Sequence, residues 1–235
     1  MDLWKKILRP WLIPSMNREV LKAEGLSFAY DKDLILDDIN FTIYEGDLVA
    51  LVGANGVGKS TLLKLILKEL KAQKGHIEIF SDDIKKDKHY RDLAYISQQA
   101  VSSYRNFPTS VEEAIKIHLA YMKKNNNPKD LLEKLGLYAH RKKSLNELSG
   151  GQIQRFAISL ALIKDASLIL LDEPTTGIDE DFSRGFFENL LALKKEDKTI
   201  LIITHQLDMA GQYVDYALRI RKRKIEKISK DELSL

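Results

Sequence analysis

Apolar residues alternate with polar or small ones over the first third of the chain, and this pattern predicts strands. The alternating positions are Leu26, Phe28 and Tyr30 in one run and Ile39, Phe41 and Ile43 in the next. A period of two is typical of antiparallel strands that bury one face. A third apolar run, residues 77–80, follows a turn that Lys-Gly-His predicts at residues 74–76. We therefore expect a small antiparallel β lobe.

Further along the chain, continuous apolar runs alternate with helical spacing. The runs predict buried strands at 48–52, 168–171 and 200–204, and the spacing predicts helices at 152–163 and 181–194. Residues 111–137 also show helical spacing, interrupted at 125–128, and are expected to belong to a helical insert that spans about 100–163. Strands that alternate with helices form a parallel sheet. The expected fold class is α/β, with a terminal hairpin after the last strand.

The strand at 48–52 leads straight into a glycine-rich stretch with the pattern G-x-x-x-x-G-K-S. Glycines at such a strand-to-helix junction let backbone N–H groups converge on phosphates at the helix N-terminus. In this pattern Lys59 is expected to reach the β- and γ-phosphates of a nucleotide, and Ser60 to ligate Mg²⁺. The predicted binding residues are Gly53, Ala54, Asn55, Gly56, Val57, Gly58, Lys59, Ser60 and Thr61.

Two carboxylates, Asp172 and Glu173, follow the apolar strand at 168–171. Ligands of open α/β folds bind at the carboxyl ends of the strands, so both side chains are expected to face the phosphate loop. Asp172 is predicted to hold Mg²⁺, and Glu173 to orient and polarise the water that attacks the γ-phosphate. A solvated helix cap is the alternative, but the phosphate loop upstream favours the catalytic interpretation.

A second candidate anion site precedes the helix at 152–163. Its residues are Ser149, Gly150, Gly151 and Gln152, which would expose backbone N–H groups at a helix N-terminus. A plain helix cap is the alternative, because serine is a preferred capping residue. One chain has one phosphate loop, so the second site is expected to serve the nucleotide of another copy. The chain is therefore predicted to form a homodimer.

Length and composition narrow the class of protein. The 235 residues are enough for one α/β domain, which we place at residues 18–235. The net charge of +3 gives no reason to expect a nucleic-acid partner. The chain has no cysteine, which excludes thiolate metal sites and thiol nucleophiles. No apolar run approaches the roughly 20 residues of a membrane-spanning helix, so a role in membrane transport would require partner subunits.

Both ends of the chain carry basic stretches. Residues 1–17 mix basic and apolar side chains and are interrupted by Pro10 and Pro14. We expect a leader that is poorly ordered or lies on the surface, with a membrane-surface anchor as the alternative. The basic run at 219–230 is expected to be the solvated edge of the terminal hairpin. A role for this run at anionic lipid or nucleic acid is the alternative.

Taken together, the motifs resemble those of the nucleotide-binding subunit of ATP-binding cassette (ABC) transporters, over about residues 20–228. In that family the phosphate loop is the Walker A motif, residues 148–152 are the signature motif and residues 168–173 are Walker B, and all three stand here without departure. The resemblance implies a P-loop NTPase fold, with a RecA-like parallel sheet, an antiparallel β lobe and a helical insert. It also implies hydrolysis of ATP with Mg²⁺ at a head-to-tail dimer.

The resemblance assigns four further residues. Tyr30 takes the aromatic position that stacks on adenine, although a core strand residue is the alternative. Gln98 takes the Q-loop position, whose amide oxygen ligates Mg²⁺, with Gln99 as a close competitor. His205, at the end of an apolar strand, takes the position of the switch histidine that contacts the γ-phosphate. Asp179 takes the D-loop position at the dimer interface, and is otherwise an ordinary turn residue.

The transported substrate is open to inference only through the same resemblance. The chain has one cassette and shows neither a long heptad run nor fused membrane helices. These features favour an importer subunit, which would dock on integral membrane permease subunits at the cytoplasmic face of the cell membrane. Tyr104, Phe107 and Ile115 are expected to line the groove that receives the permease. Residues 95–113 are similar to the Q-loop region of zinc and manganese uptake ATPases. Another substrate, or a soluble regulatory clamp without transport, is the alternative.

The metal itself is not expected to contact this chain. A permease and an extracytoplasmic metal-binding protein would carry it, with zinc favoured over manganese. The histidines His76, His89, His118 and His140 are scattered at no metal-ligand spacing and are expected to lie on the surface.

Overall fold

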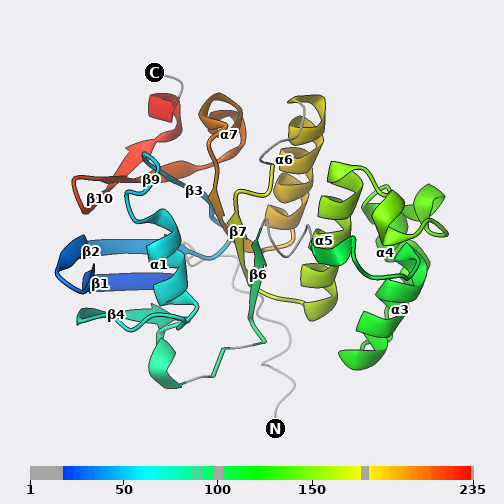
Figure 1. The fold of residues 1–235 in the computed structure, drawn as a ribbon, viewed down its shortest axis with the longest axis horizontal. Coiled ribbons are helices and arrows are strands. Elements are labelled where there is room, and N and C mark those ends of the chain that lie inside the picture. The colour runs from blue at the N-terminus through cyan, green and yellow to red at the C-terminus, as the bar shows by residue number, and fades with distance from the viewer. Residues whose placement is uncertain (1–17, 87, 90, 98–102, 176–179, 234–235) are drawn as a thin grey trace, which may run out of the picture.

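The structure, a computed structural model, describes residues 18–86, 88–89, 91–97, 103–175 and 180–233, with only the backbone of 181 and 182. Its strands form two sheets (Figure 1), a four-stranded sheet of order β2-β1-β4-β5 and a six-stranded sheet of order β10-β9-β3-β8-β7-β6. The four-stranded sheet contains β1 (Glu19–Tyr30), β2 (Asp33–Tyr44), β4 (Lys74–Ile79) and β5 (Asp82–Asp83). The six-stranded sheet contains β3 (Leu48–Val52), β6 (Leu93–Ser97), β7 (Leu168–Asp172), β8 (Thr199–Ile203), β9 (Tyr216–Arg221) and β10 (Lys224–Ser229).

The helices of the described residues fall between these strands. They are α1 (Lys59–Ile66), α3 (Val111–Tyr121), α4 (Pro128–Lys134), α5 (Gly150–Lys164), α6 (Glu180–Lys194) and α7 (Leu207–Tyr213). Short 3₁₀ helices are η2 (Ile84–Lys86), η3 (Tyr138–His140), η4 (Leu145–Glu147) and η5 (Lys230–Leu233). None of the helices in this described part is long and apolar enough to cross a membrane.

The pairing of the strands confirms the predicted α/β class. In the six-stranded sheet, β3 pairs in parallel with β8 and β9, and β7 pairs in parallel with β8 and β6. Only the terminal hairpin of β9 and β10 is antiparallel in this sheet. In the β lobe, β1 pairs antiparallel with both β2 and β4. A parallel core with an antiparallel lobe is therefore the observed architecture.

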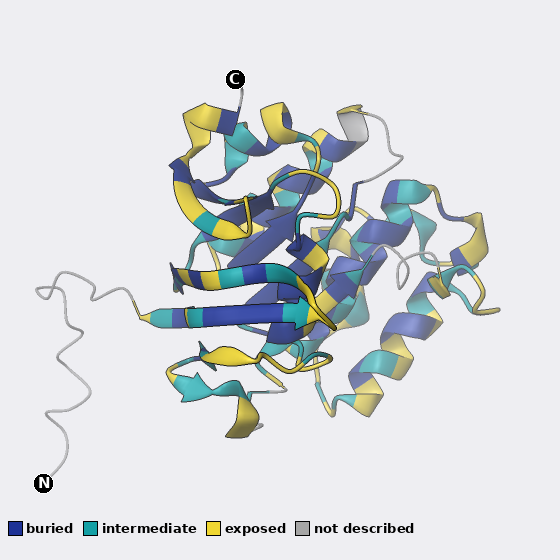
Figure 2. Ribbon diagram, turned by 60° about the vertical axis from the view of Figure 1, so that its left-hand side comes forward, coloured by how far each residue is buried: buried dark blue, intermediate teal, exposed yellow. Residues whose placement is uncertain are grey.

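Two apolar cores cover the two faces of the six-stranded sheet. Successive residues of β3 point to opposite faces, so Ala50 lies in the core shared with α3, α5 and α6, and Leu51 lies in the core shared with the β lobe and α1. Figure 2 shows the buried strands at the centre, with exposed residues on the outer loops and helix faces. Because both faces are covered, the central strand β3 consists of continuous apolar residues.

Capping residues mark the first turns of α3 and α4, two helices of the predicted helical insert. Ser110 accepts a bond from the backbone N–H of Glu113, and the Glu113 carboxylate accepts from the N–H of Ser110, so a capping box begins α3. Asn127 caps α4, with Pro128 in its first turn, which explains the predicted interruption at 125–128.

Three features differ from the prediction. The predicted turn at 74–76 is instead the start of β4, strand β6 was not predicted, and α7 follows β8 where only a hairpin was expected. The glycine that suggested the turn, Gly75, is required by a close approach. A Cβ at this position would lie 2.3 Å from the carbonyl oxygen of Glu24 on the neighbouring strand β1.

We expect Gly75→Ala to lower the free energy of unfolding by about 2–4 kcal/mol, because the new methyl group collides with the β1 backbone and the backbone φ is positive. Gly46→Ala is the matched control. Gly46 has a φ of 78° against 74° for Gly75, but a Cβ there meets nothing within 4 Å. It should cost only the backbone strain, about 1 kcal/mol. Urea unfolding followed by circular dichroism measures both, and equal losses would refute the steric explanation.

Candidate active site

Neighbouring parallel strands bring the predicted site residues to one edge of the six-stranded sheet. Strand β8 lies between β3 and β7, and the three strands run in the same direction. The phosphate loop follows β3, Asp172 ends β7, and His205 lies two residues beyond β8. The backbone N–H of Glu173 donates to the carbonyl of Ile203 at 3.0 Å, which holds the ends of β7 and β8 together.

The phosphate loop has a backbone that requires glycine. Gly58, the N-cap of α1, has a φ of 114°, and a Cβ there would lie 2.9 Å from a methyl carbon of Leu36. No side-chain hydrogen bond from the described residues caps α1. Residues 54–56 are exposed at the open side of the loop. A bound anion could therefore accept hydrogen bonds from the first turn of this helix.

Lys59 lies across this loop. Its Nζ donates to the carbonyl oxygens of Gly53 at 2.7 Å and Ala54 at 3.0 Å, and only 6% of the residue is exposed. Burial lowers the pKa of Lys59, and the nearby carboxylates of Glu173 and Asp172 oppose this shift. The two loop carbonyls therefore hold the ammonium group. Phosphate oxygens at this place would be stronger acceptors than the two carbonyls.

Glu173 and His205 form a direct pair at the ends of β7 and β8. The Nε2 atom of His205 lies 2.8 Å from Oε1 of Glu173. Because the carboxylate accepts, this nitrogen is assigned as the donor. Glu173 also has a φ of 49°, a left-handed conformation that is uncommon for a residue with a side chain. Such strain is concentrated at functional sites, because the surrounding structure must maintain it.

Asp172 is held by a residue that the sequence analysis did not single out. The hydroxyl of Tyr95 donates to Oδ2 of Asp172 at 3.3 Å. Burial raises the pKa of Asp172, and the Tyr95 bond opposes this increase. Burial also raises the pKa of Tyr95, to about 12. The short apolar run of residues 93–96 was the signal that could have placed this tyrosine on a strand.

The donors at this edge fit a magnesium ion. Asp172 supplies a carboxylate whose burial disfavours its charge, so a nearby cation would stabilise it. Ser60 supplies an exposed hydroxyl in the first turn of α1. Carboxylate and hydroxyl oxygens are the hard ligands that Mg²⁺ prefers. Gln98, the third predicted magnesium ligand, and Asp179 lie outside the described residues.

Tyr30 lies at the end of β1 with 44% of its surface exposed. Its ring contacts Phe28 edge to face, with centroids 4.9 Å apart at 87°. Phe28 is buried, so it supports the tyrosine from below. The flat face of an exposed, supported ring is suited to stack on a base.

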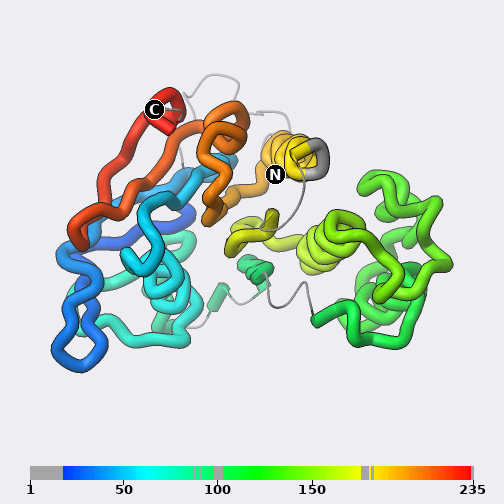
Figure 3. Tube along the Cα trace, turned by 45° about the horizontal axis from the view of Figure 1, so that its top comes forward, coloured from blue at the N-terminus to red at the C-terminus, as the bar shows by residue number. Residues whose placement is uncertain are grey.

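The segment 149–152 forms a helix cap in this chain. The N–H of Gln152 donates to Oγ of Ser149 at 3.4 Å, and the N–H of Ser149 donates to Oε1 of Gln152 at 3.0 Å. The Gln152 side chain also contacts Nε2 of His140 at 2.9 Å. Figures 1 and 3 place α5, which this segment begins, on the other side of β6 and β7 from α1. The structure therefore does not bring the segment to the phosphate loop of the same chain.

A large cavity of about 1070 Å³ lies between the edge strand β6 and helices α3 and α5. Tyr104, one of the residues predicted to line the permease groove, lines this cavity, and its ring contacts Phe156 edge to face with centroids 5.5 Å apart. Phe107 is 61% exposed but does not line this cavity. Ile115 was wrongly expected in the groove. It is fully buried, because it shares the inner face of α3 with Val111 and Leu119.

The histidines are less exposed than expected. His89 is mostly buried and lies between two carboxylates, with Nδ1 2.9 Å from Asp92 and Nε2 3.2 Å from Asp82. No group of three or more His, Asp or Glu side chains in the described part of the chain is arranged to hold a metal ion. In the terminal hairpin, Arg219 pairs with Glu226 at 2.6 Å, so part of its basic charge is neutralised locally.

Comparison with known proteins identifies the family of the chain. A family model described as ABC transporter matches residues 36–176. The zinc uptake system ATP-binding protein ZurA of Listeria monocytogenes is 35% identical over 216 residues, which cover 88% of this chain and 84% of that protein. The manganese transport system ATP-binding protein MntB of Bacillus subtilis is 33% identical over 214 residues, which cover 87% of this chain and 84% of that protein. Among solved structures, cbiO1 of Clostridium perfringens, part of the transporter complex cbiONQ, has a TM-score of 0.79 at 27% identity, over 92% and 90% of the two chains.

The family match covers more than half of the chain and includes the phosphate loop and both carboxylates. Subunits of this kind bind and hydrolyse ATP, dimerise, and work with membrane permeases. The chain thus belongs to the ABC transporter family.

Proposed function

We propose that this chain is the ATPase subunit of a divalent-metal importer that carries zinc or, as second choice, manganese. Two copies would pair head to tail and dock on permease subunits at the cytoplasmic face of the cell membrane, and an extracytoplasmic metal-binding protein would deliver the metal. The proposed ATPase activity rests on one observation. Lys59, Asp172, Glu173 and His205 lie at the same edge of the six-stranded sheet.

The phosphates of ATP would bind the loop of residues 53–61. Lys59 would exchange its two carbonyl acceptors for β- and γ-phosphate oxygens, which are charged and therefore stronger acceptors. The exposed ring of Tyr30 would stack on adenine. Mg²⁺, when bound, neutralises charge on the phosphates, and Ser60, Asp172 and Gln98 would hold it.

In the hydrolysis step, the Glu173 carboxylate would orient and polarise a water molecule for attack on the γ-phosphorus. The bond from the γ-phosphorus to the bridging oxygen breaks as the new P–O bond forms, and ADP and phosphate leave. His205, which donates to Glu173 at 2.8 Å, would keep the carboxylate in place and contact the γ-phosphate. The strained backbone of Glu173 supports this role, because it fixes where the carboxylate points.

The second half of each nucleotide site would come from the other copy. Ser149, Gly150, Gly151 and Gln152 would face the γ-phosphate held by the partner's loop, with Asp179 at the interface. This arrangement is supported by the separation of α5 from α1 within one chain (Figure 3). The capping box already uses the N–H groups of Ser149 and Gln152, which leaves those of Gly150 and Gly151 at the helix end to face the partner's nucleotide.

Residues 18–235 would form one nucleotide-binding domain after a leader of residues 1–17. The helical insert, about 100–163, would receive the permease in the cavity between β6, α3 and α5. Its wall presents the aromatic rings of Tyr104 and Tyr121, and Ile117 is exposed nearby on α3. The wall also presents charged side chains, including Arg91, Lys123 and Lys164, so a partner would meet both aromatic and charged groups there.

The cargo is inferred from the zinc and manganese systems to which the similar subunits ZurA and MntB belong. Deletion of the gene in its own organism should lower cellular zinc and prevent growth when zinc is chelated. Added zinc, or the parent gene on a plasmid, should restore growth. Metal contents are measured by mass spectrometry.

A plasmid that carries Glu173→Gln is the matched control, because the subunit is present but its proposed water-activating group is absent. It should not restore growth. A deletion strain that loses manganese rather than zinc would assign the second cargo. A strain with unchanged zinc and manganese contents would reject metal import and favour another substrate or the regulatory clamp.

A further inference from the structure

Tyr95 lies between the proposed nucleotide site and two cavities of the chain. It lies on β6, the edge strand of the six-stranded sheet. The parallel pairing of β6 with β7 places Ser97 opposite Asp172 and Tyr95 opposite Leu170. From there the tyrosine side chain extends toward the strand ends, where its hydroxyl donates to Oδ2 of Asp172 at 3.3 Å.

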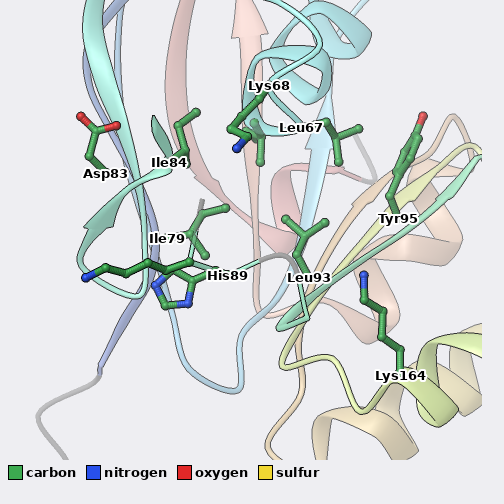
Figure 4. A pocket seen from close by; sticks show the side chains of 11 residues that line it. Leu67, Lys68, Ile79, Asp83, Ile84, His89, Leu93, Tyr95 and Lys164 are labelled. Carbon is green, nitrogen blue, oxygen red and sulfur yellow. The ribbon is translucent and has the colours of Figure 1, made fainter. Parts of the chain in front are cut away.

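The ring of Tyr95 also forms part of the wall of two cavities. The smaller cavity, about 300 Å³, lies beside the end of α1 and includes Leu67, Lys68 and Leu93. Figure 4 shows the Tyr95 ring at the side of this cavity, with its hydroxyl pointing away from Lys164. The larger cavity, about 1070 Å³, is the proposed permease groove, and Tyr95 lines it together with Tyr104 and His118.

We propose that Tyr95 is a positioning residue that holds the Asp172 carboxylate for Mg²⁺ and conveys the occupancy of the larger cavity to it. The inference rests on the proposed function, because it takes Asp172 as a magnesium ligand. A hydrogen-bond donor behind a metal-binding carboxylate fixes its rotation and favours its charged form. Because the same ring forms the groove wall, a partner that displaces the ring must also move or break this bond.

The geometry explains why one bond matters here. Asp172 ends β7 and is only partly exposed, and the Tyr95 hydroxyl donates to its Oδ2 at 3.3 Å. A buried tyrosine hydroxyl must find a partner inside the protein, but 37% of Tyr95 is exposed, so burial does not force its hydroxyl to bond Asp172. Loss of the hydroxyl should therefore change Mg²⁺ binding while the ring, and with it the packing, is kept.

Tyr95→Phe in the full chain tests the first half of the proposal. The Mg²⁺ concentration for half-maximal binding of the fluorescent analogue mant-AMPPNP should rise about three- to tenfold, the effect of one hydrogen bond. Binding of the analogue in EDTA should not change. Tyr121→Phe is the matched control, because it removes a hydroxyl from the same cavity that does not bond Asp172. An unchanged Mg²⁺ midpoint in Tyr95→Phe would overturn the inference.

Asp172→Asn separates this failure from a failure of the proposed function. A changed Mg²⁺ midpoint in Asp172→Asn, with an unchanged one in Tyr95→Phe, would refute Tyr95 alone. An unchanged midpoint in Asp172→Asn would instead refute Asp172 as a magnesium ligand. Melting temperatures of all variants show that each is folded before the comparison is made.

The second half of the proposal is tested by filling the groove. The chain has no cysteine, so His118→Cys, on the groove wall, can be labelled selectively with benzylmaleimide. The label should shift the Mg²⁺ midpoint, and the shift should disappear when Tyr95→Phe is present as well. Mass spectrometry confirms complete labelling. A label that leaves the midpoint unchanged, or that shifts it equally with and without the Tyr95 hydroxyl, would refute transmission through Tyr95.

Discussion

Glu173→Gln is expected to bind ATP and to accumulate as a closed dimer, while ATP hydrolysis falls by about a hundredfold or more. The amide keeps the shape of the side chain and an oxygen that accepts from Nε2 of His205, so the pair at 2.8 Å can persist. It loses the negative charge that polarises the attacking water. Because ATP is bound but not consumed, the head-to-tail dimer that it bridges should remain assembled.

Gel filtration with and without ATP measures the dimer, and phosphate release measures the hydrolysis rate. Glu188→Gln is the matched control, because Glu188 is an exposed residue of α6 outside the proposed site. It should hydrolyse ATP at the parent rate. A Glu173→Gln chain that stays monomeric with ATP and turns over at the parent rate would show that the base has been assigned to the wrong residue.

The sequence was sufficient for the parts of the fold whose pattern is local. Strand β3 is a run of five apolar residues and β8 has four after Thr199, and such runs are expected for parallel strands buried on both faces. The phosphate loop and the carboxylates at 172 and 173 lie at the ends of strands, so their common sheet edge could also be anticipated. That β8 lies between β3 and β7 required the structure, because strand order depends on packing between distant segments.

Two of the three wrong predictions, those for α7 and Gly75, were decided by tertiary packing. Helix α7 has only seven residues and contains a glycine, and it is held mainly by the burial of Met209 and Ala210. Gly75 belongs to β4 because the neighbouring strand passes too close for a side chain. Ile115 was placed in the groove although its spacing from Val111 puts it on the inner face of α3. Contacts with distant segments decided the first two outcomes, whereas local helical spacing decided the third.

Tyr95 illustrates the same limit within the active site. Its strand, β6, was considered only as the lead into Gln98, so the apolar run of residues 93–96 was not used. Even with the strand assigned, the bond to Asp172 depends on β6 pairing in register with β7. The motif residues could be found from the sequence because their types and spacing are fixed by phosphate chemistry. Their supporting partners are fixed by the fold.

Lys59→Ala is expected to lower the affinity for ATP by about a hundredfold or more and so to abolish hydrolysis at micromolar ATP. Lys59 would supply the positive charge that contacts both the β- and γ-phosphates. The change should have little effect on folding. The variant loses two hydrogen bonds to the carbonyls of Gly53 and Ala54, but it also removes a cation whose burial lowers its pKa. Calorimetric titration with ATP measures the affinity, and the melting temperature tests the folding.

Two further variants distinguish the charge from its placement. Lys64→Ala removes a lysine from the exposed side of the same helix and should bind ATP as the parent does. Lys59→Arg keeps the charge, but a planar, forked guanidinium cannot occupy the narrow place between two loop carbonyls as a single ammonium does. We expect it to recover little of the affinity. Normal turnover in Lys59→Ala would mean that the phosphates do not bind at this loop, and the proposed active site would have to be abandoned.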